Sequence, residues 1–173
     1  MKQAIENCFP QILNGDCLAV DNRSKFHIYD SNDNPKRCFI SQNETDEIHF
    51  TAINSDNKDV QFLAIDKCIF DDQGPSRCDF ALFSDLDFCF IEIKDVKIRG
   101  RQKARIRAKN QLLNTIEEFV QKGIEFDDIG LNAIICFVER DLYPSRSAQY
   151  NDTILEFEER FGSKFLIANN FTF

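Results

Sequence analysis

The sequence contains no tryptophan and only two histidines, His27 and His49. Both histidines lie in strand-like segments, far from any residue in the setting of a catalytic nucleophile. A nucleophilic cysteine needs a base within hydrogen-bond reach, so a catalytic cysteine is not expected. The chain of 173 residues also lacks internal repeats, linkers and low-complexity tracts, and its length favours a single domain over residues 1–173.

The cysteines form no C-x-x-C motif, and their number is odd. Several of them, including Cys89 and Cys136, lie inside apolar segments. We therefore expect buried free thiols in a reducing compartment and no structural zinc site. The full set is Cys8, Cys17, Cys38, Cys68, Cys78, Cys89 and Cys136.

No stretch of the chain approaches 18 uninterrupted apolar residues, so no transmembrane span and no membrane partner are expected. Residues 1–6 lack the apolar centre of a signal peptide. These features predict a cytoplasmic protein.

What the chain has in abundance is phenylalanine, and the richest stretch is a predicted hairpin. Two apolar strands, 78–83 and 88–94, are separated by a Ser-Asp-Leu-Asp turn. Because the start of the first strand lies beside the end of the second, Asp79 should meet Glu92 and Lys94. Two neighbouring carboxylates repel unless a proton or a cation lies between them, and a hard divalent cation is the natural oxygen-bound partner.

This arrangement resembles the PD-(D/E)XK nuclease superfamily. The resemblance rests on Asp79, on the triplet Glu92-Ile93-Lys94 and on Gln111 in a downstream helix, and it covers roughly residues 60–140. It implies an α/β fold in which a central mixed sheet is flanked by helices, a restriction-endonuclease-like core with an extra N-terminal antiparallel hairpin region. The implied activity is hydrolysis of phosphodiester bonds in nucleic acid, with DNA favoured.

The same resemblance implies roles for these residues. Asp79 and Glu92, with the Ile93 carbonyl as a further ligand, would hold Mg²⁺ or Mn²⁺. Lys94 would orient water or stabilise developing negative charge, and Gln111 would position water or substrate backbone. Two other interpretations stay open: a surface Glu–Lys pair at a strand end, and a buried glutamine bonded to a strand carbonyl.

Positive charge is concentrated in one segment, although the net charge is −8. Residues 94–109 hold eight of the 21 lysines and arginines and a single acid, Asp95. Such a run can bind phosphates, while a solvated helix start or a contact for an acidic partner is the alternative. The expected nucleic-acid contacts after Lys94 are Lys97, Arg99, Arg101, Lys103, Arg105, Arg107 and Lys109.

Periodicity predicts the remaining elements. Helices are expected over 2–13, where Pro10 interrupts, over 102–122, ending at Gly123, and over 152–161, capped by Asn151 or Asp152. Further strands are expected over 26–29, 37–42, 47–53, 60–70, 131–138 and 164–169. We expect 47–53 and 60–70 to form a second hairpin. The last strands should join the central sheet, partly in parallel.

Two functions of other classes compete with a nuclease. One is a non-catalytic binding or assembly subunit that keeps the fold and acts with a protein partner or as a homodimer. The other is an inhibitor or immunity-type protein that binds a basic partner through its acidic surface. Metal-dependent cleavage would distinguish a nuclease from both of these alternatives.

Overall fold

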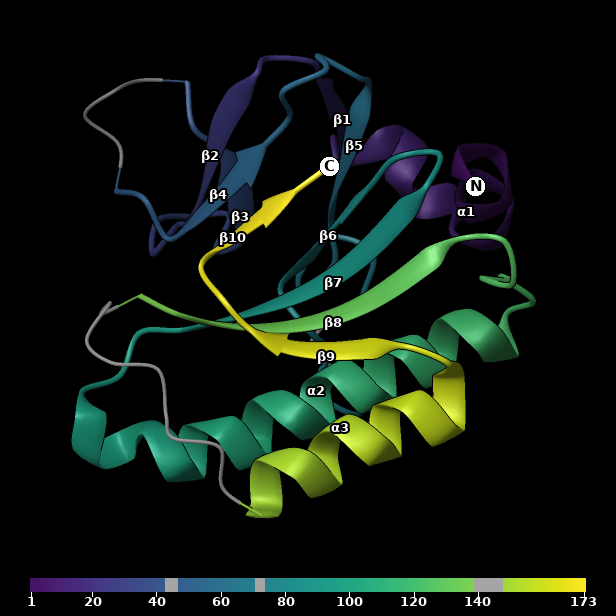
Figure 1. Ribbon diagram of the computed structural model, residues 1–173. Helices are drawn as coiled ribbons and strands as arrows, with labels where there is room; N and C mark the ends of the chain where they lie inside the picture. Colours follow the sequence, from purple (N-terminus) through teal and green to yellow (C-terminus); the bar gives the residue numbers. More distant parts are fainter. Residues whose placement is uncertain (43–46, 71–73, 139–147) are drawn as a thin grey trace.

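The computed structural model describes residues 1–42, 47–70, 74–138 and 148–173. They form three layers, with helices on one face of a long sheet and a smaller sheet on its other face (Figure 1). The expected mixed α/β class is confirmed. Helices flank the central sheet on one face only, because the second sheet takes the place of helices on the other.

Among the described residues, six strands form the central sheet in the order β1-β5-β6-β7-β8-β9. The predicted central hairpin is present as antiparallel β6 and β7, and β8 and β9 then add in parallel, as expected from the crossover helices. The strands are β1 (Leu18–Asp21), β5 (Val60–Ala64), β6 (Phe80–Phe83), β7 (Asp87–Lys94), β8 (Gly130–Phe137) and β9 (Lys164–Ile167).

The second sheet has the order β10-β4-β2-β3 in the described part of the chain. Its N-terminal strands pair antiparallel, as predicted, but the C-terminal strand β10 joins β4 in parallel and was not predicted; neither was β1. The strands are β2 (Lys25–Asp30), β3 (Cys38–Ile40), β4 (Phe50–Ile53) and β10 (Asn170–Thr172).

The predicted hairpin of 47–53 with 60–70 is wrong, because β4 and β5 belong to different sheets. The turn between them exists: the buried Asn54 side chain donates to the Lys58 carbonyl at 2.8 Å and accepts from the Lys58 amide at 3.0 Å. This turn carries the chain from one layer to the other. β5 also ends early, at Ala64, because the Ile65 carbonyl then accepts the amides of three following residues and closes a tight turn over 65–70.

The helices are α1 (Lys2–Cys8), α2 (Arg101–Gln121) and α3 (Ala148–Phe161), with 3₁₀ turns η1 (Pro10–Asn14) and η2 (Ile98–Gly100). Pro10 divides the first helical segment as expected, and Gly123, at φ +85°, follows α2 in a conformation that favours glycine. The cap predicted at Asn151 or Asp152 is wrong, because α3 begins at Ala148. No described helix has the length and apolar character needed to cross a membrane.

The core is divided by the central sheet. Phe83, Phe88 and Phe90 pack toward α2 with Phe119, while Phe80 packs toward the second sheet with Phe50. Alternation along the strands sends neighbouring residues to opposite layers, so Phe88 and Phe90, two positions apart, share one layer. The two strands predicted over 88–94 and 131–138 also supply Ile91, Ile93, Ile134, Ile135 and Phe137, which are all buried.

One cysteine prediction is wrong. Cys17, just before β1, and Cys68, in the turn after β5, form a disulfide. Residues 51 positions apart in the chain come together because β1 pairs with β5, so no local spacing reveals them. The other five cysteines are free, and four of them are buried.

Candidate active site

The β6–β7 hairpin brings Asp79 and Glu92 together as predicted. Phe80 pairs with Ile91, so Asp79 and Glu92 form the next position outward along the hairpin. The Ile93 amide donates to Asp79 Oδ2 at 2.6 Å, and Lys94 Nζ contacts Glu92 Oε1. The alternative of a surface Glu–Lys pair is wrong, because Glu92 is 0% exposed.

Burial leaves negative charge at this end of the sheet poorly compensated. Desolvation is the largest effect on both acids: it raises the pKa of Asp79 to about 7, against the lowering effect of the Ile93 hydrogen bond, and it raises the pKa of Glu92 well above its ordinary value. Glu92 Oε2 is buried and has no hydrogen-bond partner among the described residues. Lys94 thus faces the buried Glu92 carboxyl group and the half-buried Asp79, and a second cation or a proton would balance the remaining negative charge.

Helix α2 holds the three residues that lead into Asp79. The Gln111 amide donates to the Arg77 carbonyl at 2.9 Å, and the Thr115 hydroxyl accepts from the Cys78 amide at 2.8 Å. Asn114 donates to the Ser76 carbonyl at 3.2 Å. The side chain of Gln111 therefore fixes the backbone before Asp79. This is close to the alternative of a buried glutamine bonded to a strand carbonyl, but Gln111 is half-buried and Arg77 precedes β6.

Thr115 and Asn114 were missed by the sequence analysis. Thr115 follows Gln111 by four residues and so lies on the same helix face, which is the signal that could have indicated it. The side chain of Arg77 adds a further anchor, because its guanidinium pairs with Glu118 at 3.1 Å and lies over the Phe70 ring, 4.8 Å from the centroid. Asp79 therefore sits on a backbone held from several sides.

A small pocket of about 180 Å³ adjoins Asp79. It takes Asp30 from the end of β2, so the second sheet contributes an acid that the sequence analysis did not select. Burial raises the pKa of Asp30, and the charge of Asp30 in turn raises the pKa of Asp79. The charged residues around the pocket are Asp30, Asp66, Asp79, Lys36, Arg37 and Lys67.

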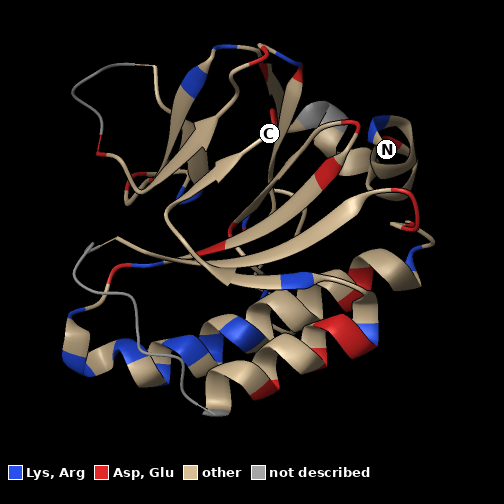
Figure 2. Cartoon of the chain, viewed as in Figure 1, with Lys and Arg blue, Asp and Glu red and all other residues tan. Residues whose placement is uncertain are grey.

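The basic segment follows the site into η2 and the first half of α2, where lysines and arginines gather (Figure 2). Lys97, Arg99, Lys103 and Arg107 are exposed. Arg101, Arg105 and Lys109 are half-buried on another face of the helix.

Two of the half-buried cations make contacts inside the protein. Arg101 lies over the Phe137 ring, 5.3 Å from the centroid, and Lys109 pairs with Glu156 of α3. The hydrogen bond from Lys109 is the largest of the effects that lower the pKa of Glu156. The predicted row of seven phosphate contacts therefore divides into an exposed set and a set that packs within the protein.

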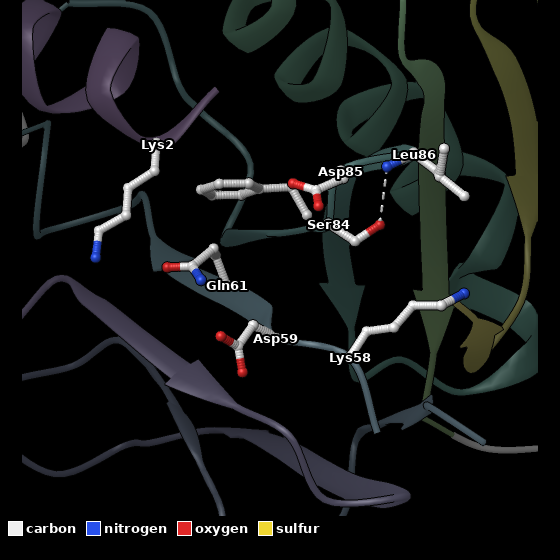
Figure 3. Close-up of a pocket in the computed structure, with 8 residues that line it drawn as sticks. Lys2, Lys58, Asp59, Gln61, Ser84, Asp85 and Leu86 are labelled. Atoms are coloured by element: carbon white, nitrogen blue, oxygen red, sulfur yellow. Dashed lines mark hydrogen bonds between the residues drawn. The ribbon is translucent and has the colours of Figure 1, made fainter. Parts of the chain in front are cut away.

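A larger pocket, of about 570 Å³, lies at the opposite end of the hairpin (Figure 3). The Ser84 hydroxyl there accepts from the Leu86 amide at 3.2 Å, within the turn itself. Helix α1 lies beside this turn (Figure 1), and its Lys2 lines the pocket. The residues that line the pocket are Lys2, Lys58, Asp59, Gln61, Phe83, Ser84, Asp85 and Leu86.

Within the described ranges, no group of three or more histidine, cysteine, aspartate or glutamate side chains could hold a metal ion together. The donors at the candidate site are instead a pair of carboxylates, a set that suits a hard cation keeping most of its own waters. Comparison of the chain with family models, curated proteins and solved structures finds no match. The geometry of the site is therefore the basis on which a function can be proposed.

Proposed function

We propose that this protein is a metal-dependent nuclease that hydrolyses phosphodiester bonds, DNA being the favoured substrate. The observation that carries the proposal is the buried Glu92 carboxylate beside Asp79, with Oε2 unpartnered in the described structure. Natural proteins rarely bury an acid next to a second carboxylate without a compensating role. Mg²⁺ or Mn²⁺ between the two carboxylates would supply that compensation.

Each residue of the chain has a distinct task in this proposal. Asp79 and Glu92, with the Ile93 carbonyl, would hold the ion, which when bound lowers the pKa of a coordinated water and withdraws charge from the phosphate. Lys94 orients the attacking water or stabilises the negative charge that develops on phosphate oxygens. Gln111 and Thr115 act as positioning residues, because they hold the backbone that carries Asp79.

The exposed basic residues next to the site favour a polyanionic substrate. Lys97 and Arg99 follow the catalytic strand directly, and Lys103 and Arg107 continue along α2. A phosphate backbone lying along them would reach Lys94 and the carboxylates. The overall negative charge would keep the rest of the surface free of nucleic acid.

The test is Mn²⁺ calorimetry together with cleavage of plasmid and linear DNA and of RNA. Glu92→Gln and Asp79→Asn are expected to lose both Mn²⁺ binding and cleavage. Lys94→Met is expected to lose cleavage by a factor of about 10² or more while keeping nucleic-acid binding. Asp85→Asn, an acid in the exposed turn of the same hairpin, is the control and should behave as wild type. Equal Mn²⁺ affinity in wild type and Asp79→Asn would overturn the proposal.

A second candidate is the non-catalytic subunit that binds nucleic acid or a protein partner. Two observations favour it: Glu92 is buried, and it contacts Lys94. An ion pair of this kind can have a structural role without taking part in catalysis. In this case the exposed basic residues bind, Lys94→Met changes stability alone, and no divalent ion is taken up. Binding without cleavage in wild type, with Mn²⁺ present, would favour this function.

A further inference from the structure

Cys17 and Cys68 form a disulfide, whereas the other cysteines are free thiols. Five thiols are free, and four of them are buried, as is usual for proteins kept in a reducing environment. Disulfides found in such environments are usually transient, catalytic or redox-sensing. Cys17 is 0% exposed, whereas Cys68 is half-buried, so Cys68 is the sulfur that a thiol can approach.

The turn that carries Cys68 is bonded directly to the backbone of Asp79. The Ile65 and Asp66 amides both donate to the Asp79 carbonyl, at 2.9 and 3.2 Å. The Ile65 carbonyl in turn accepts from the Cys68 amide at 3.3 Å. Residues 65–70 thus form one compact turn, attached at one point to the disulfide and at another to the candidate catalytic acid.

A cation also lies at this disulfide. Arg37, from the second sheet, places Nη1 at 2.5 Å from Cys68 Sγ and at 2.8 Å from the Gly15 carbonyl. A guanidinium beside sulfur stabilises the negative charge that forms when the sulfur leaves as a thiolate. Arg37 also lines the same pocket as Asp66 and Asp79, so this one side chain contacts the disulfide and adjoins the candidate site.

We propose that Cys17–Cys68 is a thiol–disulfide exchange site for a dithiol reductant, and that its reduction loosens residues 65–70 and the backbone of Asp79. One thiolate of the dithiol attacks Cys68 Sγ, the Cys17–Cys68 bond breaks, and Cys17 sulfur leaves and takes a proton. The second thiol of the dithiol then attacks the mixed disulfide and releases Cys68 as a thiolate beside Arg37. Two electrons pass to the protein and the dithiol becomes a cyclic disulfide.

The exchange is tested by counting thiols and by its rate. After equilibration with oxidised glutathione, unfolding and alkylation should label the five free cysteines, and after dithiothreitol all seven. Seven labels in both samples would overturn the proposal. Arg37→Gln should slow reduction of the folded protein by dithiothreitol by about threefold to tenfold, and Arg37→Lys should restore most of the rate. Equal rates in all three proteins would remove Arg37 from the mechanism.

The link to Asp79 is tested by hydrogen exchange, without metal or nucleic acid, so it does not depend on the proposed nuclease activity. Reduction should lower the protection of the Ile65 and Asp66 amides by about tenfold or more while leaving the amides of β8 unchanged. The double variant Cys17→Ser/Cys68→Ser should reproduce the reduced state. Cys8→Ser, at a free half-buried cysteine, is the matched control and should match wild type. Unchanged protection at Ile65 and Asp66 would show that the disulfide is not coupled to the site.

Discussion

The two ends of the β6–β7 hairpin carry the same kinds of residue in opposite surroundings. At the turn, the Ser84 hydroxyl accepts amides of the turn, the Leu86 carbonyl accepts the Gly130 amide at 2.8 Å, and Asp85 is exposed to water. At the open end, Asp79 lines a pocket with Asp30 of the second sheet, and Glu92 Oε2 is buried and unpartnered within the described chain. The Ser84 hydroxyl thus bonds within the turn, and the acid of the turn faces water. At the open end, α2 holds the backbone before Asp79, and Glu92 Oε2 leaves charge uncompensated.

Burial, and not residue type or pocket size, therefore distinguishes the candidate site at the open end from the turn. The pocket at the turn is about three times larger, at about 570 Å³ against about 180 Å³, yet its acids are solvated and need no partner. A carboxylate in water is already stabilised, whereas a buried one requires a cation, a proton or several donors. The open end therefore has a reason to bind an ion, and the turn end has none.

The largest expected effect comes from removing the cation at each end. Lys94→Met leaves the buried Glu92 without its cationic partner and should lower the free energy of unfolding at pH 8 by about 3–5 kcal/mol. Lys58→Met, at the exposed pair with Asp56, should change it by less than about 1 kcal/mol. Urea unfolding without divalent ions measures both. Similar losses for the two variants would remove the distinction between the ends.

The pH dependence of stability sharpens the same contrast. The pKa of Asp79 is raised from 3.8 to about 7 in the folded protein, so between these values the folded chain holds a proton that the unfolded chain releases. The contribution of Asp79 to stability should therefore fall as pH rises through this window and level off above about pH 7, and the raised pKa of Glu92 acts in the same direction. Asp79→Asn should flatten that fall. At pH 8 the variant should therefore be more stable than wild type by about 2–4 kcal/mol. The upper end of this range is the pKa shift multiplied by about 1.4 kcal/mol per pH unit.

Thermal unfolding in EDTA from pH 4.5 to 8.5 measures this effect. Asp85→Asn is the control at the exposed turn and should follow the wild-type curve throughout. A wild-type curve that rises steadily across the window, with no difference from Asp79→Asn, would contradict the burial argument.

The anchor at the open end can be tested with two threonines, Thr115 in α2 and Thr153 in α3. Thr115 and Thr153 both donate to the carbonyl four residues earlier, at 2.7 and 2.9 Å, but Thr115 also accepts the buried Cys78 amide. Thr115→Val should therefore cost about 1–3 kcal/mol, because it leaves that amide unpaired. Thr153→Val should cost less than about 1 kcal/mol. Under the proposed function, Thr115→Val should also reduce cleavage more than its loss of stability explains, as single-turnover kinetics at low temperature would show.

Much of the open end could be predicted because its causes are local. The alternation of Phe88, Phe90 and Glu92 fixes their common face, and the turn fixes which residues of the two strands meet. The burial of Ile134 and Phe137 follows from a continuous apolar run, and the break at Pro10 follows from proline chemistry. These features depend on neighbours within a few residues.

What could not be predicted depends on contacts between distant segments. Asp30 reaches the pocket because the second sheet covers the first, and Cys17 meets Cys68 because β1 pairs with β5. The turn at Asn54 has the same sequence pattern whether the next strand stays in its sheet or changes layers. Nothing in the local sequence around Arg77 indicates that α2 holds it.

The smallest and last expected effect concerns α2, whose basic first half begins at the open end of the hairpin and whose second half carries Glu117 and Glu118 (Figure 2). If the exposed cations follow a phosphate backbone, each phosphate that is no longer neutralised should reduce the slope of log affinity against log salt by roughly 0.9. Lys103→Gln/Arg107→Gln should therefore flatten the slope by about two units if both side chains bind phosphate. Lys109→Gln should leave the slope unchanged, because Lys109 pairs with Glu156 and the variant affects only that ion pair.

Fluorescence anisotropy at several salt concentrations, with Ca²⁺ replacing Mg²⁺, measures the slopes. Equal slopes in the double variant and wild type would show that binding, if present, uses another surface, and a flattened slope in Lys109→Gln would show that its pair with Glu156 opens for nucleic acid.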